Sequence, residues 1–331
     1  MTGRPVRVAI NGFGRIGRTL MRLILSEARD IELVLVNDIA EPDLMAYLFG
    51  YDSVFGPWPE PVTARNGALQ AGRHSVPLHQ AEDLRALDLS GVDVVLECTG
   101  LATSRPVAEA GLDAGARRVL ISGPSPAADV TLVLGANDER LAGQPVVSNT
   151  SCTTNALAPL LRLLDGTWGV ESGQMTTVHC YTGSQPTVDK PRGTPERSRA
   201  AALSMVPTTT SAGALIGEVL PSLRGRVEAR ALRVPTASVS SIDLTVRLRR
   251  PAPPEDVNAA LRDAAEGSDV FGWIEAPLVS TDLRGRCESI IMSGPGTSVA
   301  GDLTRLFGWY DNEWGFSCRM LDMARRMAAE G

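Results

Sequence analysis

The chain has 331 residues, of which 44% are hydrophobic and 21% charged, and its formal net charge is -6. These values are typical of a globular protein with about two domains and exclude a disordered or fibrous chain. The acidic balance argues against a general nucleic-acid surface. The sequence contains no run approaching the ~20 apolar residues of a membrane span. We therefore expect neither a nucleic-acid partner nor a membrane.

The cysteines and histidines exclude two further kinds of site. The five cysteines are scattered, odd in number and form no CxxC pair, so we expect no disulfide framework and a reducing compartment, the cytoplasm. The three histidines lack clustered cysteine or histidine partners, so we expect no metal site. The N-terminus runs directly into a strand pattern, and we expect no signal peptide.

The first thirty residues of patterned sequence predict one supersecondary unit. Residues 6–10 form a short apolar run, residues 16–28 carry apolar side chains at helical spacing, and residues 31–36 form a second buried strand. Strand, glycine turn, helix and strand in this order are typical of the βαβ unit of a dinucleotide fold.

Further strands predict that this sheet continues to about residue 150. Apolar runs lie at residues 92–97, 118–121, 131–134 and 146–147, with a helical stretch at 105–114. Short buried strands separated by helices favour a mostly parallel sheet covered by helices.

The pattern changes after residue 150. We predict a helix over residues 153–164, strands suited to an antiparallel sheet over 174–181, 226–234 and 237–248, and an amphipathic helix over 317–330. Residues 182–198 are rich in Pro, Gly, Arg and Thr and predict one long ordered loop, which is usually functional or at an interface. The fold class is therefore α/β, a Rossmann-type doubly wound sheet followed by an α+β domain with a mixed or antiparallel sheet.

A glycine motif predicts the cofactor. Gly12-Phe13-Gly14-Arg15-Ile16-Gly17 matches GxGxxG, follows a strand and opens a helix, so the backbone can approach a pyrophosphate at a helix N-terminus. Asp38 ends the next strand, 21 residues after Gly17, where a carboxylate accepts both ribose hydroxyls of NAD and repels the 2′-phosphate of NADP. Thr99-Gly100 and Ser122 follow later strands and are candidate cofactor walls. We therefore predict an NAD-binding domain over residues 1–150, completed by a C-terminal helix 314–331, and a catalytic domain over 151–313.

Cys152 is the candidate nucleophile. Ser151 and Thr153 flank it, and the helical run follows at once, so Cys152 should lie in the first turn of a helix, which stabilises a thiolate. The free N–H groups there can also hold a developing oxyanion. A thiol needs a base at neutral pH. His179, at the end of a predicted strand, is the leading candidate, with His74 and His79 as alternatives in a weakly patterned stretch.

Nine ordered segments carry a resemblance to a known family. They read INGFGRIGR, VND, YDSVFG, ECTG, SCTTNALAP, TVHCYTGSQPTVD, RVPTASVSSIDLTV, PLVSTD and WYDNEWGF. Together they resemble glyceraldehyde-3-phosphate dehydrogenase of the phosphorylating type across nearly the whole chain, and SCTTN with a downstream histidine is highly specific for that superfamily.

The resemblance implies a reaction and roles for more residues. It implies that Cys152 and His179 oxidise an aldehyde with NAD through a thiohemiacetal and a thioester, which inorganic phosphate cleaves. It implies that Thr182 and Arg233 hold the substrate's phosphate, that Ser151, Thr153, Thr210 and the neighbouring Ser211 hold the attacking phosphate, and that Asn312 and Phe316 lie beside the nicotinamide. It also implies a glycolytic homotetramer in which loop 182–198 reaches a neighbouring subunit.

Departures from the family pattern leave more than one function open. Ser211 stands where the family commonly has glycine, Phe316 where it has tyrosine, Thr150 where it has alanine, and Ala102 replaces a bulky residue. Phe316 is shared with erythrose-4-phosphate dehydrogenase, whereas Tyr181-Thr182 favours a three-carbon substrate. The departures are also compatible with an inhibitor-tolerant paralogue of the glycolytic enzyme and with a non-catalytic redox sensor.

Overall fold

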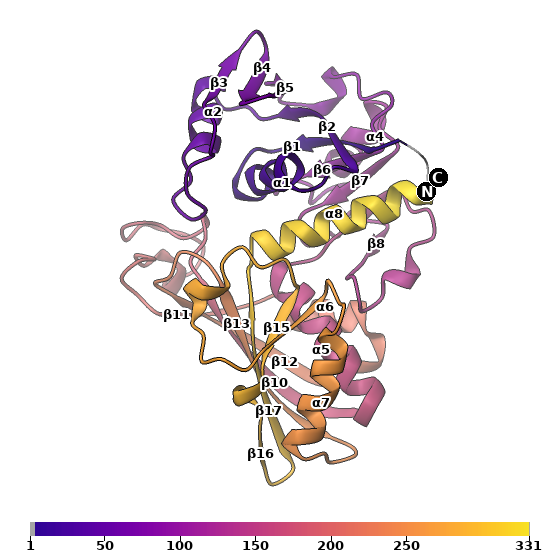
Figure 1. The fold of residues 1–331 in the computed structure, drawn as a ribbon, viewed down its shortest axis with the longest axis vertical. Coiled ribbons are helices and arrows are strands. Elements are labelled where there is room, and N and C mark those ends of the chain that lie inside the picture. The colour runs from indigo at the N-terminus through magenta and orange to yellow at the C-terminus, as the bar shows by residue number, and fades with distance from the viewer. Residues whose placement is uncertain (1–3, 331) are drawn as a thin grey trace. The chain divides into compact units, whose positions relative to one another are not determined.

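The structure is a computed structural model that describes residues 4–330 and divides into two compact units (Figure 1). The first unit comprises the chain up to Leu132, Glu139–Thr150 and the chain from Ser317 onward. The second comprises Val133–Asp138 and Ser151–Phe316. Each unit has a sheet and a hydrophobic core of its own.

Within residues 4–330, the first unit contains a nine-stranded sheet in the order β3-β4-β5-β2-β1-β6-β7-β9-β8. Its strands are β1 Val6–Asn11, β2 Ile31–Asn37, β3 Val62–Arg65, β4 Ala68–Ala71, β5 His74–His79, β6 Val94–Glu97, β7 Arg118–Ile121, β8 Val130–Thr131 and β9 Val146–Ser148. All pairs from β5 to β8 in that order are parallel. The predicted doubly wound sheet is confirmed.

The helices of the first unit are mostly short. They are α1 Arg15–Ser26, α2 Pro42–Gly50, α3 Arg105–Ala108 and α4 Ala110–Asp113, with 3-10 helices at Leu84–Ala86 and Asp138–Arg140, the latter crossing the boundary between the units. The last helix, α8 Trp314–Ala329, belongs to this unit from Ser317 onward, where Arg325 pairs with Asp30. Its apolar side chains, including Met320, Met323 and Met327, are buried.

Three features of the first unit differ from the sequence prediction. Strands β3 to β5 form antiparallel hairpins in the stretch interpreted as weakly patterned. The missed signal is Asn66-Gly67, whose φ angles of 53° and 71° suit a tight hairpin turn. The helix predicted over 105–114 divides at Glu109, and β8 ends at Thr131, before the predicted residue 134.

Within the described part of the chain, the second unit contains an eight-stranded sheet in the order β11-β12-β10-β13-β17-β15-β14, with β16 paired to β17. Its strands are β10 Val170–Cys180, β11 Val206–Thr209, β12 Val227–Val234, β13 Ser240–Leu248, β14 Phe271–Ile274, β15 Ile290–Ser293, β16 Ser298–Ala300 and β17 Leu303–Tyr310. Strands β10 and β12 are parallel, so the sheet is mixed rather than purely antiparallel. The long connection between them, which includes α6, returns the chain to the same direction.

Helices α5, α6 and α7 lie along one side of this sheet (Figure 1). Their bounds are α5 Cys152–Trp168, α6 Ala212–Val219 and α7 Pro254–Ala265, with 3-10 helices at Glu196–Ser198, Pro221–Leu223, Ser280–Leu283 and Gly294–Gly296. Leu157, Leu160 and Leu161 of α5 are fully buried in the same core as Ile242 and Leu244 of β13. This packing fixes the start of α5, and hence Cys152, against the sheet.

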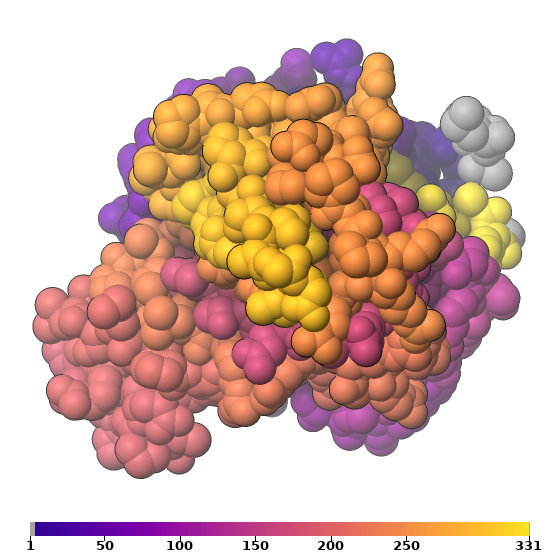
Figure 2. Space-filling model, turned by 90° about the horizontal axis from the view of Figure 1, so that it is seen from below, coloured from indigo at the N-terminus to yellow at the C-terminus, as the bar shows by residue number. Residues whose placement is uncertain are grey.

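The predicted loop after β10 has only one short 3-10 helix, at Glu196–Ser198, before β11. In Figure 2 the salmon atoms of this segment form a lobe on the face shown. Val188, Leu203 and Met205 are 71%, 84% and 70% exposed. Three large exposed apolar side chains on one loop suit an interface.

Candidate active site

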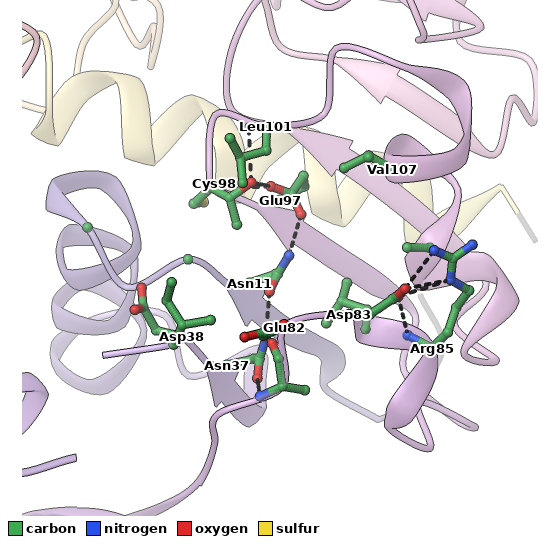
Figure 3. Close-up of a pocket in the computed structure, with 17 residues that line it drawn as sticks. Asn11, Asn37, Asp38, Glu82, Asp83, Arg85, Glu97, Cys98, Leu101 and Val107 are labelled. Carbon is green, nitrogen blue, oxygen red and sulfur yellow. Dashed lines mark hydrogen bonds and ion pairs between the residues drawn. The ribbon is translucent and has the colours of Figure 1, made fainter. Parts of the chain in front are cut away.

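A cavity of ≈ 400 Å³ opens in the first unit at the carboxyl ends of β1, β2 and β6 (Figure 3). Of the residues predicted to bind the cofactor, Gly12, Gly14, Asp38 and Thr99 line it. The cavity is also lined by twelve residues that the sequence analysis did not single out, namely Asn11, Asn37, Ile39, Ala81, Glu82, Asp83, Leu84, Arg85, Glu97, Leu101, Val107 and Ala110. Three of these, Asn11, Asn37 and Glu97, are the last residues of β1, β2 and β6, and residues 81–85 lie in the segment after β5.

The glycines of the motif allow two close backbone approaches. Gly12 has φ +93°, and a Cβ there would lie 2.6 Å from the amide nitrogen of Thr99. A Cβ on Gly17 would lie 2.1 Å from the carbonyl oxygen of Gly12. Both positions therefore require glycine, as the motif predicted. Helix α1 begins at Arg15 after Gly14, which has no side chain to cap the helix, so its N-terminus is open to a ligand on the side of Gly14.

Asp38 is held with its charge in the cavity. The amide of Phe13 donates to Oδ2 at 2.6 Å and the amide of Ala40 donates to Oδ1 at 2.9 Å. These bonds fix the carboxylate while each oxygen keeps a further lone pair for a hydroxyl donor.

Several residues of the predicted set lie elsewhere in the first unit. Phe13 is buried in the core and Ile16 lies within α1. The guanidinium of Arg15 pairs with Asp52. Gly17, Gly100 and Ser122 do not line the cavity. Cys98 also lines the cavity, and burial with the nearby charge of Glu97 raises the pKa of its thiol well above the usual range.

Cys152 in the second unit is the first residue of α5, as predicted. Ser151 is the N-cap, and its hydroxyl accepts from the amide of Thr154 at 3.2 Å. Cys152 Sγ lies 3.5 Å from Nε2 of His179, at the end of β10. Burial raises the pKa of the Cys152 thiol, although the charge of Arg233 and the amide of Thr153 act in the opposite direction.

His179 lies beside Arg233 because β10 and β12 place them at paired positions. Nδ1 of His179 is 2.7 Å from the carbonyl oxygen of Cys180 and 2.7 Å from a terminal nitrogen of Arg233. Burial, reinforced by the Arg233 charge, lowers the pKa of His179 to about 3. The thiol and imidazole are therefore both neutral at pH 7 in this state.

A buried tyrosine beneath this pair was missed by sequence reasoning. The hydroxyl of Tyr310 lies 2.9 Å from Oγ1 of Thr153 and 2.8 Å from Oγ1 of Thr177, and its ring meets His179 edge-on. Burial raises the pKa of Tyr310 far above its usual value, so the hydroxyl stays protonated. The WYDNEWGF segment contains this tyrosine, but nothing in its pattern marks a bond to Thr153.

The other predicted phosphate ligands come from separate segments. The hydroxyl of Thr182 lies 2.9 Å from that of Ser184, and the hydroxyl of Thr210 accepts from the amide of Ala212 at 3.2 Å. Ser211 precedes α6 without a side-chain capping bond. Arg233 is the member of this group that contacts His179 directly.

Asn312 has a defined amide orientation. Its Oδ1 accepts from the thiol of Cys180 at 3.1 Å and lies 3.3 Å from the hydroxyl of Ser240, both buried. Nδ2 is therefore left as a donor for a ligand. Phe316 is buried, and its amide lies 3.4 Å from the carbonyl oxygen of Asp311.

Comparison with known proteins now identifies the family. Residues 6–105 match the model described as the glyceraldehyde 3-phosphate dehydrogenase NAD binding domain, and residues 151–312 match the model of its C-terminal domain. The chain is 45% identical over 326 residues to glyceraldehyde-3-phosphate dehydrogenase 1 of Streptomyces avermitilis, covering 96% of this chain and 97% of that protein. It is 44% identical over 333 residues to the glyceraldehyde-3-phosphate dehydrogenase of Xanthobacter flavus, covering 98% and 99%. The chain belongs to the glyceraldehyde-3-phosphate dehydrogenase family.

As a member of the glyceraldehyde-3-phosphate dehydrogenase family, the chain is an NAD-dependent dehydrogenase. The residues present fit NAD, because the space beside Gly14 at the start of α1 is open to a pyrophosphate and Asp38 presents a carboxylate to a ribose. Ile39 and Leu101 in the cavity wall are 73% and 68% exposed, and such apolar side chains suit the faces of an adenine ring.

The cavity also contains a buried acidic network (Figure 3). Glu97 accepts from Nδ2 of Asn11 at 2.5 Å and from the amide of Thr99 at 2.9 Å, and Asn37 donates to Oδ1 of Asn11 at 2.8 Å. The network fixes the ends of β1, β2 and β6 relative to one another, so that the turns after them form one wall.

The described residues contain neither a candidate metal site nor a candidate membrane-spanning helix. Among residues 4–330, no group of three or more His, Cys, Asp or Glu side chains has the arrangement of a metal site. Over the same residues, no helix is both long enough and apolar enough to cross a membrane.

Proposed function

We propose that this protein oxidises D-glyceraldehyde 3-phosphate to 1,3-bisphosphoglycerate with NAD and inorganic phosphate, through a thioester on Cys152. The observation that carries the proposal is the 3.5 Å contact between Cys152 Sγ and His179 Nε2 at the N-terminus of α5. A thiol at a helix N-terminus with a base in reach is the arrangement that covalent aldehyde chemistry needs.

The residues of the second unit act in sequence. Cys152 loses its proton to His179, its sulfur bonds to the aldehyde carbon, and His179 returns the proton to the former carbonyl oxygen to give a thiohemiacetal. His179 then takes the hydroxyl proton as the carbon loses a hydride and becomes a thioester. NAD, when bound, accepts that hydride. An oxygen of inorganic phosphate attacks the thioester carbon, the carbon–sulfur bond breaks, and the Cys152 thiolate is regenerated.

The roles of the remaining residues follow from the same proposal. Thr182 and Arg233 hold the substrate's phosphate, and Ser151, Thr153, Thr210 and Ser211 hold the attacking phosphate, since hydroxyls and guanidinium are good phosphate ligands. Asn312 donates Nδ2 to the carboxamide of the nicotinamide and Phe316 packs beside the ring. Gly12, Phe13, Gly14, Arg15, Ile16, Gly17, Asp38, Thr99, Gly100 and Ser122 form the cofactor-binding segments.

The proposal extends to domains, assembly and location. Residues 1–150 with helix 314–331 form the NAD-binding domain, and residues 151–313 form the catalytic domain. The exposed Val188, Leu203 and Met205 support a homotetramer in which this loop contacts another subunit. A glycolytic role in the cytoplasm fits the five free cysteines.

A second candidate function has an observation in its favour. Phe316 is buried at a position where the family commonly has tyrosine, and phenylalanine there is shared with erythrose-4-phosphate dehydrogenase.

A third candidate, an inhibitor-tolerant paralogue, is supported by Thr150, a buried β-branched residue at φ 57° two positions before Cys152. A β-branched side chain at that φ is strained, which suits a site altered near its nucleophile.

The deciding experiment measures NADH formation from glyceraldehyde 3-phosphate with and without inorganic phosphate, with NAD and NADP in parallel. The proposal predicts phosphate-dependent reduction of NAD. Activity with erythrose 4-phosphate but not with glyceraldehyde 3-phosphate would replace it by the four-carbon activity. Oxidation of Cys152 without NADH formation from any aldehyde would instead indicate a redox sensor.

A further inference from the structure

The thiol of Cys180, at the end of β10, has no role in the proposed reaction. Its side chain is fully buried, and Sγ lies 3.1 Å from Oδ1 of Asn312, which is also buried. Burial raises the pKa of this thiol to about 12, so it keeps its proton at neutral pH. A protonated thiol is a donor and an amide oxygen is an acceptor, so the contact is an S–H···O hydrogen bond.

Ser240, at the start of β13, supplies a second donor to the same oxygen. Its hydroxyl oxygen accepts from the amide of Cys180 at 3.2 Å and lies 3.3 Å from Oδ1 of Asn312. Because the Cys180 amide already uses a lone pair of the hydroxyl, the hydroxyl hydrogen is available for Oδ1. A side-chain amide has an acceptor end and a donor end. Two donors at one end therefore place the oxygen there and turn Nδ2 away from them.

The backbone on both sides of Asn312 is fixed by other contacts. Tyr310 is paired with Ser240 in the ladder of β17 and β13. Oδ1 of Asp311 accepts from the amides of residues 313–314 at 3.0 and 2.9 Å. A half-turn of the Asn312 side chain about its last bond exchanges Oδ1 with Nδ2 and moves no backbone atom. The orientation of the amide therefore depends on the two donors.

Cys180 also contacts the proposed base, through its backbone. Its carbonyl oxygen lies 2.7 Å from Nδ1 of His179. A substitution at position 180 can therefore remove the thiol and keep this backbone contact. One residue thus holds the base on one side and Asn312 on the other. In the proposed reaction these are the groups that face the substrate and the nicotinamide.

We propose that Cys180 is a positioning residue for the cofactor: its thiol, together with the hydroxyl of Ser240, turns Nδ2 of Asn312 toward the carboxamide of the nicotinamide. The inference rests on the proposed contact between Asn312 and that carboxamide. Without the thiol, one of the two donors is lost and the reversed amide becomes populated. The reversed amide presents Oδ1 to the carbonyl oxygen of the carboxamide, and two acceptors that face each other weaken the binding of the ring.

Infrared spectroscopy of the full chain without cofactor reads the thiol directly. The chain has five cysteines, and the difference between the spectra of the wild type and of Cys180→Ala isolates the S–H stretching band of this one. Hydrogen bonding weakens the S–H bond, so we expect this band below the frequency of an unbonded thiol. Asn312→Leu removes the acceptor with a side chain of nearly the same shape. In that background the band should move to higher frequency.

Titration calorimetry with two ligands separates positioning from a general loss of structure. NAD contains the nicotinamide, and ADP-ribose is the matched ligand that lacks it. Loss of one hydrogen bond should weaken NAD binding by Cys180→Ala roughly three- to tenfold and leave ADP-ribose binding unchanged.

Two further variants test the route through Asn312. Cys180→Ser keeps a donor on a side chain of similar size and should bind both ligands as the wild type does. Asn312→Leu should weaken NAD binding, and Cys180→Ala added to it should weaken that binding no further, because the two residues act as one unit. If Cys180→Ala does not fold, Cys180→Val replaces it in the calorimetry and Cys180→Ser provides the infrared reference.

Three results would overturn the inference. They are an unbonded thiol band in the wild type, unchanged NAD affinity in Cys180→Ala, and an equal loss of affinity for NAD and ADP-ribose. If Asn312→Leu alone weakens NAD binding, Cys180 has no positioning role and the proposed role of Asn312 stands. If neither variant weakens it, both assignments are wrong. Absence of phosphate-dependent NADH formation would count against the proposed function, whereas the infrared and binding measurements involve no turnover.

Discussion

The two sites of this protein differ in whether their functional side chains carry a charge in the protein alone. In the cavity of the first unit, Asp38 keeps its carboxylate between two backbone amides, and Glu97 receives donors from Asn11 and Thr99. In the second unit, burial keeps both Cys152 and His179 neutral, and the charge of Arg233 adds to that effect on the histidine.

The difference teaches how recognition and reactivity are divided. A binding site that holds its charge in the resting state can select a ligand at once, because the desolvation cost was met by fixed hydrogen bonds on folding. A reactive pair that is neutral in the protein alone avoids the desolvation cost of a buried ion pair. Substitutions at one site should leave the other site unchanged, and the largest effects are expected at the reactive pair.

The largest effect is expected from Cys152→Ser. A serine hydroxyl lacks the thiol's acidity and forms no thioester, so kcat/KM should fall by at least about a thousandfold. The affinity for NAD, measured by titration calorimetry, should stay as in the wild type. Cys287→Ser is the matched control and should keep full activity. A comparable loss in the control would show that activity depends on thiols in general.

Replacing His179 by Asn should have the next largest effect. The variant keeps a polar side chain but removes the base, so kcat should fall by roughly 10²–10⁴. Single-turnover NADH formation measures this step. A slowing of only a few-fold would contradict the role of His179 and direct attention to His74 or His79.

Asp38→Ala attacks the other site. Two ribose hydrogen bonds to a charged acceptor are lost, so NAD should bind roughly 10- to 100-fold more weakly, while NADP loses less because a repulsion is also removed. Dissociation constants for both cofactors measure the change. Asp43→Ala, an exposed carboxylate on α2 outside the cavity, should change neither.

The neutral state of His179 predicts a pH dependence of stability. The folded protein protonates this ring only near pH 3, whereas the unfolded chain does so near 6.5, so unfolding takes up a proton between these values. The free energy of unfolding should therefore fall as pH drops through this window, by up to about 1.4 kcal/mol per pH unit from this group. Urea unfolding at pH 7 and pH 5 should show a smaller fall for His179→Gln. Equal falls would mean that the ring is protonated in the folded state.

Tyr310→Phe should have the smallest effect. It removes the hydroxyl between Thr153 and Thr177 and leaves two buried hydroxyls short of a partner, which costs about 1–3 kcal/mol. Urea unfolding measures it. Tyr47→Phe on exposed α2 is the control and should change the unfolding free energy by less than about 0.5 kcal/mol. Equal effects in the two variants would show that the buried bridge contributes nothing.

Local pattern alone determined the framework of this protein. The period of the apolar residues predicted β1, α1 and β2, and glycine spacing marked the turn between them, because backbone conformation at Gly12 and Gly17 depends on a missing Cβ. The polar residues around Cys152 predicted its place at a helix start, because capping is a property of neighbouring residues. The resemblance to the family supplied the substrate and the remaining ligands.

Only the tertiary structure decided which distant groups meet. Arg233 contacts His179 because β10 and β12 pair in parallel, a register set by the core packing of a whole sheet and invisible in either segment. The same holds for Tyr310 and Thr153, which lie 157 positions apart, and for the network of Asn11 with Glu97. Protonation follows from these meetings, because the pKa of His179 depends on its burial and on a charge that another strand supplies.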